Sequence, residues 1–271
     1  DNRPYLMEST EEHARLSIKT DEASLLEQVV WAGLKPGMSV ADVGCGPGRT
    51  TDILCRYASA AGPVPVIGID RSSDRLGHAA GSFSAEGLRF IEADVRKPLM
   101  GLGTYDFVFV RFLLEYYREE SFEIARNISS LVKPGGIFCL ADLDHNSLNY
   151  YGLPGRLDER LKEVMDVLQA RFNFDPYAGR KLYSHLFRLG LSELGVQVSA
   201  HHLVYGNISP EQDFNWRKKT EVVLRQVAPH LGISAEEAED LTVGFMSFLR
   251  EPGTFLYTPL ICCRGRKTVG T

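Results

Sequence analysis

A glycine-rich segment over residues 42–48, Asp-Val-Gly-Cys-Gly-Pro-Gly, offers the clearest chemistry in this 271-residue chain. Glycines let the backbone turn tightly and approach a ligand with no Cβ in the way. Their spacing is G-x-G-x-G, and Arg49 stands where a dinucleotide fingerprint needs its third glycine. No Gly-Lys-Ser/Thr follows, as a phosphate-cradling P-loop requires. The segment therefore favours a nucleoside with a small charged tail over a pyrophosphate cofactor.

Two further carboxylates follow the next two apolar runs. Asp70 lies 22 residues beyond Gly48, where a carboxylate can accept both hydroxyls of an unphosphorylated ribose. Asp94 ends the following run, where a carboxylate can accept an exocyclic amine of adenine. Each acid alone is equally consistent with a helix N-cap or a turn. Together with Asp42, they place acids at three consecutive strand ends, which favours a nucleoside site.

Alternating strands and helices must position these residues. Short apolar runs predict strands over residues 39–43, 66–70, 88–93, 106–110 and 137–143. Helical spacing occurs over residues 22–34, 49–60, 72–83 and 119–132. The last helix is expected to close in a Lys-Pro-Gly-Gly turn at residues 133–136. This alternation predicts a parallel sheet covered on both faces, which binds ligands at the carboxyl ends of its strands.

The pattern changes after residue 143. We expect helices over residues 156–172, 179–194, 214–227 and 235–249, and strands over residues 196–205 and 255–263. No internal repeat occurs, and no Gly/Ser linker separates these elements from the sheet. We therefore interpret residues 1–271 as one domain with two helical insertions, at residues 144–178 and 206–253.

Composition and charge narrow the classes of function. Hydrophobic residues make up 44% of the chain and charged residues 24%, which is ordinary globular usage. The net charge is -5, whereas a protein that neutralises a phosphate backbone usually has a basic excess, so nucleic acid is not the expected substrate. No run approaches the roughly 18 apolar residues of a membrane-spanning helix, and the polar first residues lack a signal-peptide profile. The five cysteines have no C-x2-C spacing, which argues against a zinc site or disulfide framework and favours a cytoplasmic protein.

Five features in this order resemble the motifs of the class I S-adenosylmethionine-dependent methyltransferases. They are the segment 42–48, Asp70, Asp94, the run Tyr-Asp-Phe-Val-Phe-Val-Arg-Phe at 105–112, and Leu-Val-Lys-Pro-Gly-Gly at 131–136. Within that family the chain is most similar to the ubiquinone/menaquinone-biosynthesis-like, or type 11, group. The resemblance implies an α/β, Rossmann-like fold, with a seven-stranded, mostly parallel sheet, an antiparallel last strand and helices on both faces.

The resemblance also implies a cofactor, S-adenosyl-L-methionine, with S-adenosyl-L-homocysteine as the product. The cofactor-binding residues that it implies are Tyr5, Arg15, Asp42, Gly44, Cys45, Gly46, Asp70, Arg71, Asp94, Val95 and Arg111. Tyr5 and Arg15 belong to an expected N-terminal helical cap, residues 1–34, which would fold over the cofactor. An arginine there can pair with the methionine carboxylate, and an aromatic ring can face the sulfonium. The alternative for both residues is a solvated amphipathic helix.

No sharp catalytic signature is present. Methyl transfer from a sulfonium requires mainly in-line alignment, exclusion of water and, where needed, removal of a proton. His145, shortly after the fifth expected strand, is the candidate general base, with a structural polar turn as the alternative. Arg111 stands where a metal-dependent catechol-type enzyme places an acid, so no metal is expected. The adjacent His201 and His202 lie in a strand pattern, which predicts one buried and one exposed ring.

The two insertions are expected to form a lid over the site. Both emerge at strand ends and both are rich in aromatic residues, so they could enclose an apolar or aromatic small molecule and exclude water. The alternative is that these aromatics only pack the insertions onto the sheet. The expected function is therefore methyl transfer to a small-molecule acceptor. A tRNA or protein methyltransferase, which would need a concentrated basic surface, and a non-catalytic cofactor-binding regulatory protein remain alternatives.

Overall fold

The computed structural model describes residues 21–269 of the chain. Its strands are β1 (Val40–Val43), β2 (Val66–Asp70), β3 (Leu88–Glu92), β4 (Tyr105–Arg111), β5 (Val132–Leu143), β6 (Asn149–Tyr151), β7 (Ser192–Tyr205) and β8 (Phe255–Arg266). Its α-helices are α2 (Glu22–Ala32), α3 (Arg49–Ala58), α4 (Ser73–Ser82), α5 (Ser121–Ile128), α6 (Gly155–Arg171), α7 (Leu182–Arg188), α8 (Pro210–Leu231) and α9 (Ala235–Arg250). None of the helices in this described range is long and apolar enough to cross a membrane.

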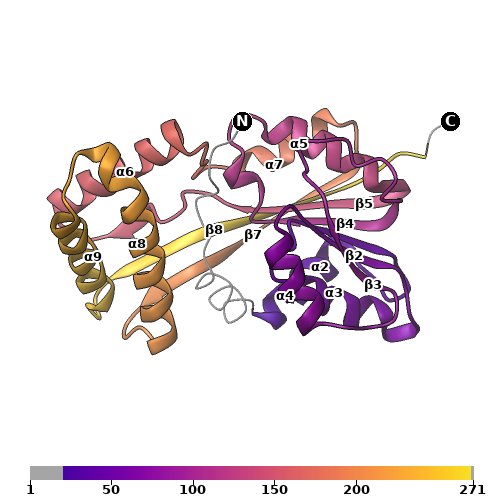
Figure 1. Ribbon diagram of the computed structural model, residues 1–271, viewed down its shortest axis with the longest axis horizontal. Coiled ribbons are helices and arrows are strands. Elements are labelled where there is room, and N and C mark those ends of the chain that lie inside the picture. The colour runs from indigo at the N-terminus through magenta and orange to yellow at the C-terminus, as the bar shows by residue number, and fades with distance from the viewer. Residues whose placement is uncertain (1–20, 270–271) are drawn as a thin grey trace.

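The strands of the described chain form one sheet in the order β3-β2-β1-β4-β5-β8-β6, with β7 paired to the other side of β8 (Figure 1). β1 to β5 are parallel, and β8 runs antiparallel to its three neighbours. The predicted Rossmann-like α/β fold with an antiparallel last strand is therefore confirmed. The sheet has eight strands in place of seven, because the three-residue β6 adds to the edge of β8.

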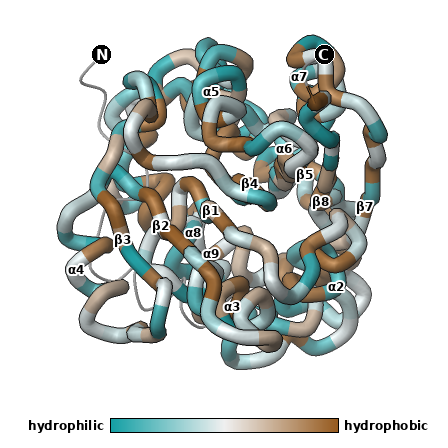
Figure 2. Tube along the Cα trace, turned by 90° about the vertical axis from the view of Figure 1, so that its right-hand side faces the viewer, coloured by the Kyte–Doolittle hydropathy of each residue, from teal (hydrophilic) through white to brown (hydrophobic). Residues whose placement is uncertain are grey.

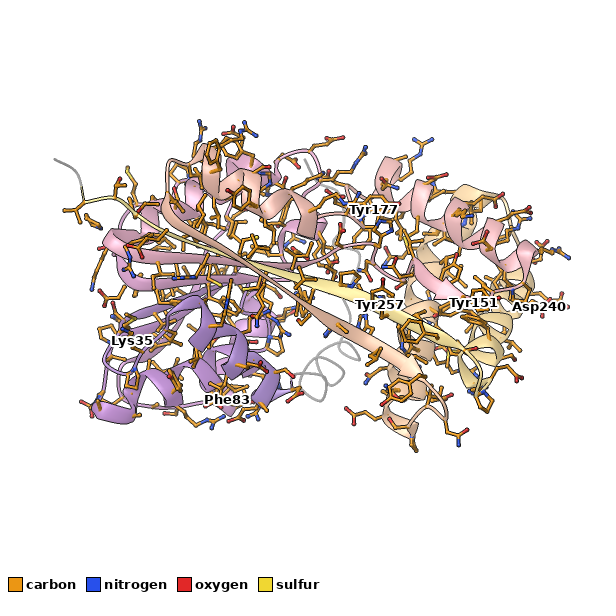
Figure 3. All side chains as sticks on the ribbon, turned by 180° about the vertical axis from the view of Figure 1, so that it is seen from behind. Lys35, Phe83, Tyr151, Tyr177, Asp240 and Tyr257 are labelled. Carbon is orange, nitrogen blue, oxygen red and sulfur yellow. The ribbon has the colours of Figure 1, made fainter. Side chains whose placement is uncertain are left out.

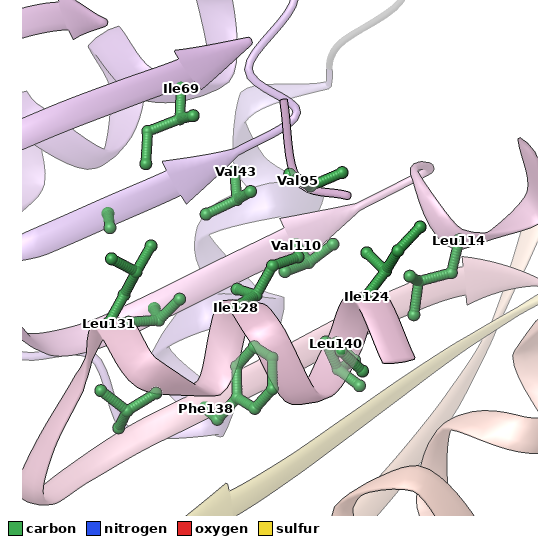
Figure 4. Close-up of a cluster of buried hydrophobic side chains, with 14 of the residues drawn as sticks. Val43, Ile69, Val95, Val110, Leu114, Ile124, Ile128, Leu131, Phe138 and Leu140 are labelled. Carbon is green, nitrogen blue, oxygen red and sulfur yellow. The ribbon is translucent and has the colours of Figure 1, made fainter. Parts of the chain in front are cut away.

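Side chains alternate between two cores on opposite faces of the sheet. In β4, Val108 and Val110 contribute to the core beneath α5 and α7, whereas Phe107 and Phe109 contribute to the core beneath α2 and α3. Figure 4 shows the first core, where Ile124 and Ile128 of α5 meet the strands. Figure 2 shows the apolar strands between α3 and α5. The covering of both faces, predicted from the strand-helix alternation, is confirmed.

Two predicted boundaries are wrong. Residues 133–136, predicted as a turn, lie within β5. Val132 of β5 pairs with Tyr105 of β4, and Ile137 pairs with Phe107, so four residues of β5 lie opposite one residue of β4. This bulge is held by the Lys133 amine, whose Nζ lies 3.0 Å from the Asp106 carboxylate. The helix expected over residues 179–194 ends as α7 at Arg188, since a glycine at position 190 with a φ of +72° turns the chain toward β7.

A long β7–β8 ribbon extends from the sheet and carries the second insertion. α8 and α9 connect its two strands, and α6 packs against both helices. In Figure 1 these three helices gather at one end of the molecule, opposite α2, α3 and α4. Figure 3 marks that end with Asp240 and the opposite end with Lys35 and Phe83. Capping boxes begin α8 at Ser209 and α9 at Ser234, which fixes where each helix starts.

Candidate cofactor and acceptor site

A cavity of about 230 Å³ lies at the carboxyl ends of the parallel strands. β1 pairs with β2 on one side and with β4 on the other, so the strand order reverses at β1 and leaves a crevice there. Gly44 follows β1, Arg111 ends β4 and Leu143 ends β5, and all three line the cavity. The sequence prediction of a ligand site at these strand ends agrees with this position.

The glycine loop bends through three left-handed residues, Gly44, Gly46 and Gly48, with φ values of +81°, +52° and +86°. A Cβ on Gly48 would lie 2.7 Å from the Cβ of Ala79, so this glycine is needed for packing. A Cβ on Gly46 would meet no atom within 4 Å, and Gly46 lines the cavity. Gly46 thus keeps open the space that a ligand would enter, whereas Gly48 brings the loop against its neighbours.

Asp70 holds this loop from the end of β2. Its carboxylate accepts hydrogen bonds from the backbone N–H of Gly46 at 2.9 Å and of Ser72 at 3.0 Å. Asp70 is 9% exposed. A carboxylate has about four acceptor positions, so these two bonds leave capacity for a ribose hydroxyl. The position of Asp70 is consistent with the predicted ribose contact, which stays a prediction.

Two charged groups of opposite sign lie beside the loop. The buried Asp42 carboxylate accepts a 2.6 Å hydrogen bond from the Thr51 hydroxyl, and burial raises the pKa of Asp42 to about 7. Burial lowers the pKa of Arg111 to about 10, although Asp42 and Asp142 favour its charged form. Among the described residues, Arg111 Nε has no hydrogen-bond partner, and the guanidinium lies 4.3 Å from the Phe112 ring centroid. Arg111 therefore presents a positive charge to the cavity.

Asp42→Asn is expected to change how stability depends on pH. The pKa of Asp42 is about 7 in the folded protein, against an ordinary value of 3.8 in the unfolded chain. Between pH 3.8 and pH 7, the folded protein therefore holds a proton on Asp42 that the unfolded chain has released. Stability therefore falls as pH rises through this range. When the pH rises from 5 to 7.5, the free energy of unfolding should fall in the wild type by about 1 to 3 kcal/mol more than in the asparagine variant. Urea denaturation at both pH values checks this, and equal losses in the two proteins would contradict it.

Asp70 and the predicted cofactor residues Arg71, Asp94 and Val95 are not among the described residues that line this cavity. Both oxygens of the Asp94 carboxylate contact the Arg96 guanidinium, which lowers the pKa of Asp94. The Val95 side chain is buried in the core beneath α5, and Arg71 is half-buried directly after β2. Cys45 lines the cavity, and burial raises the pKa of its thiol well above the ordinary value. The two remaining candidates, Tyr5 and Arg15, lie outside the described residues.

His145 does not appear among the described residues that line the cavity. Its backbone has a φ of +46°, and its ring meets the edge of Tyr177 with centroids 5.1 Å apart. Figure 3 labels Tyr177 near the junction of the sheet and the helical end. This placement corresponds to the alternative of a structural polar turn, and nothing in the geometry adds to the predicted role of general base.

Two other histidines line the cavity instead, His201 and His202 of β7. The prediction of one buried and one exposed ring is wrong, because both are half-buried and reach the same cavity. The register with β8 is irregular between His201 and Val204, and His202 has a φ of +51°, so the usual alternation of side chains fails there. His201 packs on Phe112 at 5.2 Å and His202 on Trp216 at 5.0 Å.

The insertions supply much of the remaining lining. On each helix the lining residues recur at helical spacing, so they lie on one face of that helix. They are Leu157, Arg160, Leu161, Val164, Met165 and Leu168 of α6, Trp216, Lys219, Thr220, Val223 and Leu224 of α8, and Leu241 and Phe245 of α9. These helices therefore form one side of the cavity, and their closing over it as a lid is a proposal.

A buried polar cluster, missed from the sequence, lies between the sheet and α8. The Lys219 amine donates to Asn146 Oδ1 at 3.1 Å and to Ser147 Oγ at 3.0 Å. Asn146 Nδ2 donates in turn to the Glu115 carboxylate at 3.0 Å. Burial and the neighbouring Glu115 charge raise the pKa of Asp142, which accepts from the Glu115 backbone N–H, well above its ordinary value. Among residues 21–269, no group of three or more His, Cys, Asp and Glu could hold a metal ion.

Comparison with known proteins relates part of this chain to a family. Residues 40–136 match the family model described as a methyltransferase domain. A trans-aconitate 2-methyltransferase of Rhodopseudomonas palustris is 34% identical over 101 residues, or 37% of each protein. A protein of the same name from Escherichia coli is 31% identical over 178 residues, which are 63% of this chain and 61% of that protein. This chain thus covers less than two thirds of the length of either relative.

The fold has close counterparts among solved structures. The crystal structure of the YcgJ protein from Bacillus subtilis aligns with a TM-score of 0.59 at 16% identity, and the alignment covers 92% of this chain and 100% of that one. The family match shows a methyltransferase domain over residues 40–136, a class of domain whose cofactor is S-adenosylmethionine, and the solved structure shows the same fold. The resemblance seen in the five ordered motifs is confirmed at the level of this domain.

Proposed function

We propose that this protein moves a methyl group from S-adenosyl-L-methionine to a small-molecule acceptor by in-line transfer. The observation that carries the proposal is that one cavity is lined both by the glycine loop and by the inserted helices. A cofactor on the loop and an acceptor against the helices would then lie side by side, as transfer requires.

The residues on the cofactor side fit S-adenosylmethionine. Gly46 leaves open space beside the loop, and Asp70 has acceptor capacity for a ribose hydroxyl. Arg111 offers a buried Nε and a positive charge that suit the methionine carboxylate. When bound, the cofactor supplies a methyl group made reactive by a positively charged sulfur.

On the acceptor side the chain would bind, orient and exclude water. The rings of Phe112, His201, His202 and Trp216 form a continuous series of contacts with centroid distances between 4.2 and 5.2 Å. Flat ring faces of this kind can hold an acceptor in one orientation. The apolar faces of α6, α8 and α9 would keep water from the reacting atoms. An apolar or aromatic acceptor suits this lining.

The relatives named trans-aconitate 2-methyltransferase favour a small acceptor and make an organic acid a candidate. A tRNA or protein acceptor fits less well, because three helices cover one side of the cavity and the net charge is -5.

Arg111→Met tests the proposed function at the cofactor. We expect wild type to bind S-adenosylmethionine in isothermal titration calorimetry, and the variant to bind at least about tenfold more weakly, because a hydrogen bond to a charged group contributes about 1.5 to 3 kcal/mol. Arg126→Met is the matched control, since Arg126 is an exposed arginine on α5. Absence of binding by the wild type would remove the proposal. Binding without methyl transfer to any member of a broad panel of small acceptors would favour a non-catalytic regulatory protein.

A further inference from the structure

One stretch of the sheet has a face of quite different character on each side. Past the end of β5, the strands β6, β8 and β7 continue side by side as a three-stranded extension (Figure 1). On one face, Val204 and Leu256 are buried in the core that Trp216 of α8 and Phe245 of α9 complete. On the other face, Phe255 is 46% exposed. The extension therefore leaves one face open in the part of the chain that the structure describes.

Three aromatic side chains cross this open side in one row. Tyr151 of β6 and Tyr205 of β7 both pair with Phe255 of β8, from its two sides, so the three side chains point to the same face. Tyr151 is 81% exposed and Tyr205 is 68% exposed. The Tyr257 ring lies next to Phe255, with centroids 5.6 Å apart. Figure 3 labels Tyr151 and Tyr257 on this extension.

Two valines of β7 continue the same face toward the start of that strand. Val196 pairs with Cys263 and Val198 pairs with Ile261. Positions 255, 257, 261 and 263 of β8 fall on one face of the strand, because side chains alternate, so their partners on β7 share that face. Val196 is 47% exposed and Val198 is 63% exposed. We define the open face as Tyr151, Val196, Val198, Tyr205, Phe255 and Tyr257.

The open face is large enough for a stable protein interface. An aromatic side chain has about 150 to 250 Å² of surface, so the exposed parts of these residues add up to about 600 Å². Monomeric proteins rarely expose a contiguous apolar patch of more than a few hundred Å². A standard interface buries about 800 Å² on each partner, a little over half of it apolar. The open face could therefore supply the apolar part of such an interface.

The charge pattern of the open face decides what kind of partner fits. Residues 194–205 of β7 and residues 255–263 of β8 include no Asp, Glu, Lys or Arg. Beside them, Asp144 donates its backbone N–H to the Pro259 carbonyl, and its carboxylate pairs with Arg180 at 2.8 Å. A site for an acidic or basic protein, or for an anionic lipid surface, would carry complementary charges. An uncharged sheet face is instead complementary to a second copy of itself, since two such faces can pack together as sheets.

We propose that this protein forms a two-fold symmetric dimer in which the open faces of two copies pack against each other. The inference does not depend on the proposed function, because no residue of the open face is among the described residues that line the cavity. α8 and α9 lie on the other face of the same strands. The two cavities of the dimer therefore lie away from the interface.

The test measures the mass of the full chain in solution by light scattering and by sedimentation. At chain concentrations of about 10 µM we expect the wild type to have twice the mass of one chain, because the interface has the size of stable complexes. Tyr205→Lys should weaken dimer formation at least about 100-fold, since each dimer would have to bury two ammonium groups without partners. Phe214→Lys is the matched control, because Phe214 is an exposed aromatic residue of α8 that is not part of the open face. It should leave the dimer affinity within about twofold.

A second variant keeps the test valid if Tyr205→Lys does not fold. Tyr151→Lys changes a side chain that is 81% exposed, so the fold should tolerate it, and it should also give a single chain. Circular dichroism and urea denaturation check that both variants are folded.

Three results would each overturn the proposed dimer. A monomeric wild type would leave residues 1–20 of the same chain, or a different protein, as the occupant of the open face. A dimer that persists in the folded Tyr205→Lys and Tyr151→Lys proteins would show that the copies associate elsewhere, for example along the outer edge of β7. Loss of the dimer in Phe214→Lys, to the same extent as in Tyr205→Lys, would place the contact on α8 instead of the open face.

Discussion

Asp70→Ala is expected to weaken S-adenosylmethionine binding by at least about 100-fold, because two charge-assisted hydrogen bonds of about 1.5 to 3 kcal/mol each would be lost. These bonds join the Asp70 carboxylate to the backbone N–H groups of Gly46 and Ser72. Without the Asp70 carboxylate the glycine loop is held to β2 only by the backbone N–H groups of Gly44 and Cys45, which donate to the Ile69 carbonyl, and the predicted ribose contact disappears at the same time. Titration calorimetry of the cofactor into both proteins measures the change.

Asp74→Ala provides the matched control for this effect. Asp74 is an exposed carboxylate in the first turn of α4, four residues from Asp70. Its removal should leave cofactor affinity within about twofold. Asp70→Asn should fall between alanine and wild type, since an amide oxygen can accept one of the two N–H bonds. A folded Asp70→Ala protein that binds the cofactor as wild type does would show that the carboxylate has no part in binding.

Alanine at Gly48 should mainly reduce stability and alanine at Gly46 should mainly reduce cofactor binding, although the two glycines are only two residues apart. At Gly48 the new methyl would collide with Ala79, 2.7 Å away, and with the Phe90 ring at 3.0 Å, at a backbone φ of +86°. We expect a loss of about 2 to 4 kcal/mol in the free energy of unfolding. At Gly46 the methyl meets nothing, so the loss should be about 1 kcal/mol, from the left-handed backbone alone. Cofactor affinity should nevertheless fall at least about tenfold, because the methyl occupies ligand space.

Urea denaturation and cofactor calorimetry on both variants separate these outcomes. Gly77→Ala is a third glycine variant for comparison, because Gly77 lies inside α4 with open space around its Cα. It should raise stability by about 0.5 to 1 kcal/mol, as expected for alanine in a helix, and leave binding unchanged. If Gly46→Ala binds the cofactor normally, then the open space beside Gly46 is not the cofactor site.

Local sequence patterns were enough to predict the parallel strands and the position of the glycine loop at their ends. Strands and helices of the first 143 residues follow from apolar runs, turn residues and caps, all of which are local signals. The glycine loop and Asp70 were found for the same reason, since their roles depend on standing directly after strands that can be recognised individually. The parallel order of β1 to β5 then brings these strand ends to one edge.

The other side of the cavity, where we propose that the acceptor binds, could not be predicted from local sequence. Lys219 meets Asn146 across 73 positions in sequence, a contact that exists because the β7–β8 ribbon carries α8 back over the end of β5. His201 and His202 face the cavity together because of an irregular register with β8, whereas His145 packs on Tyr177 instead. Long-range packing and bulges of this kind leave no period or motif in the local sequence. The sequence could therefore predict the strand ends at which a ligand site lies, and the surfaces proposed to select an acceptor emerged only when the distant helices were packed together.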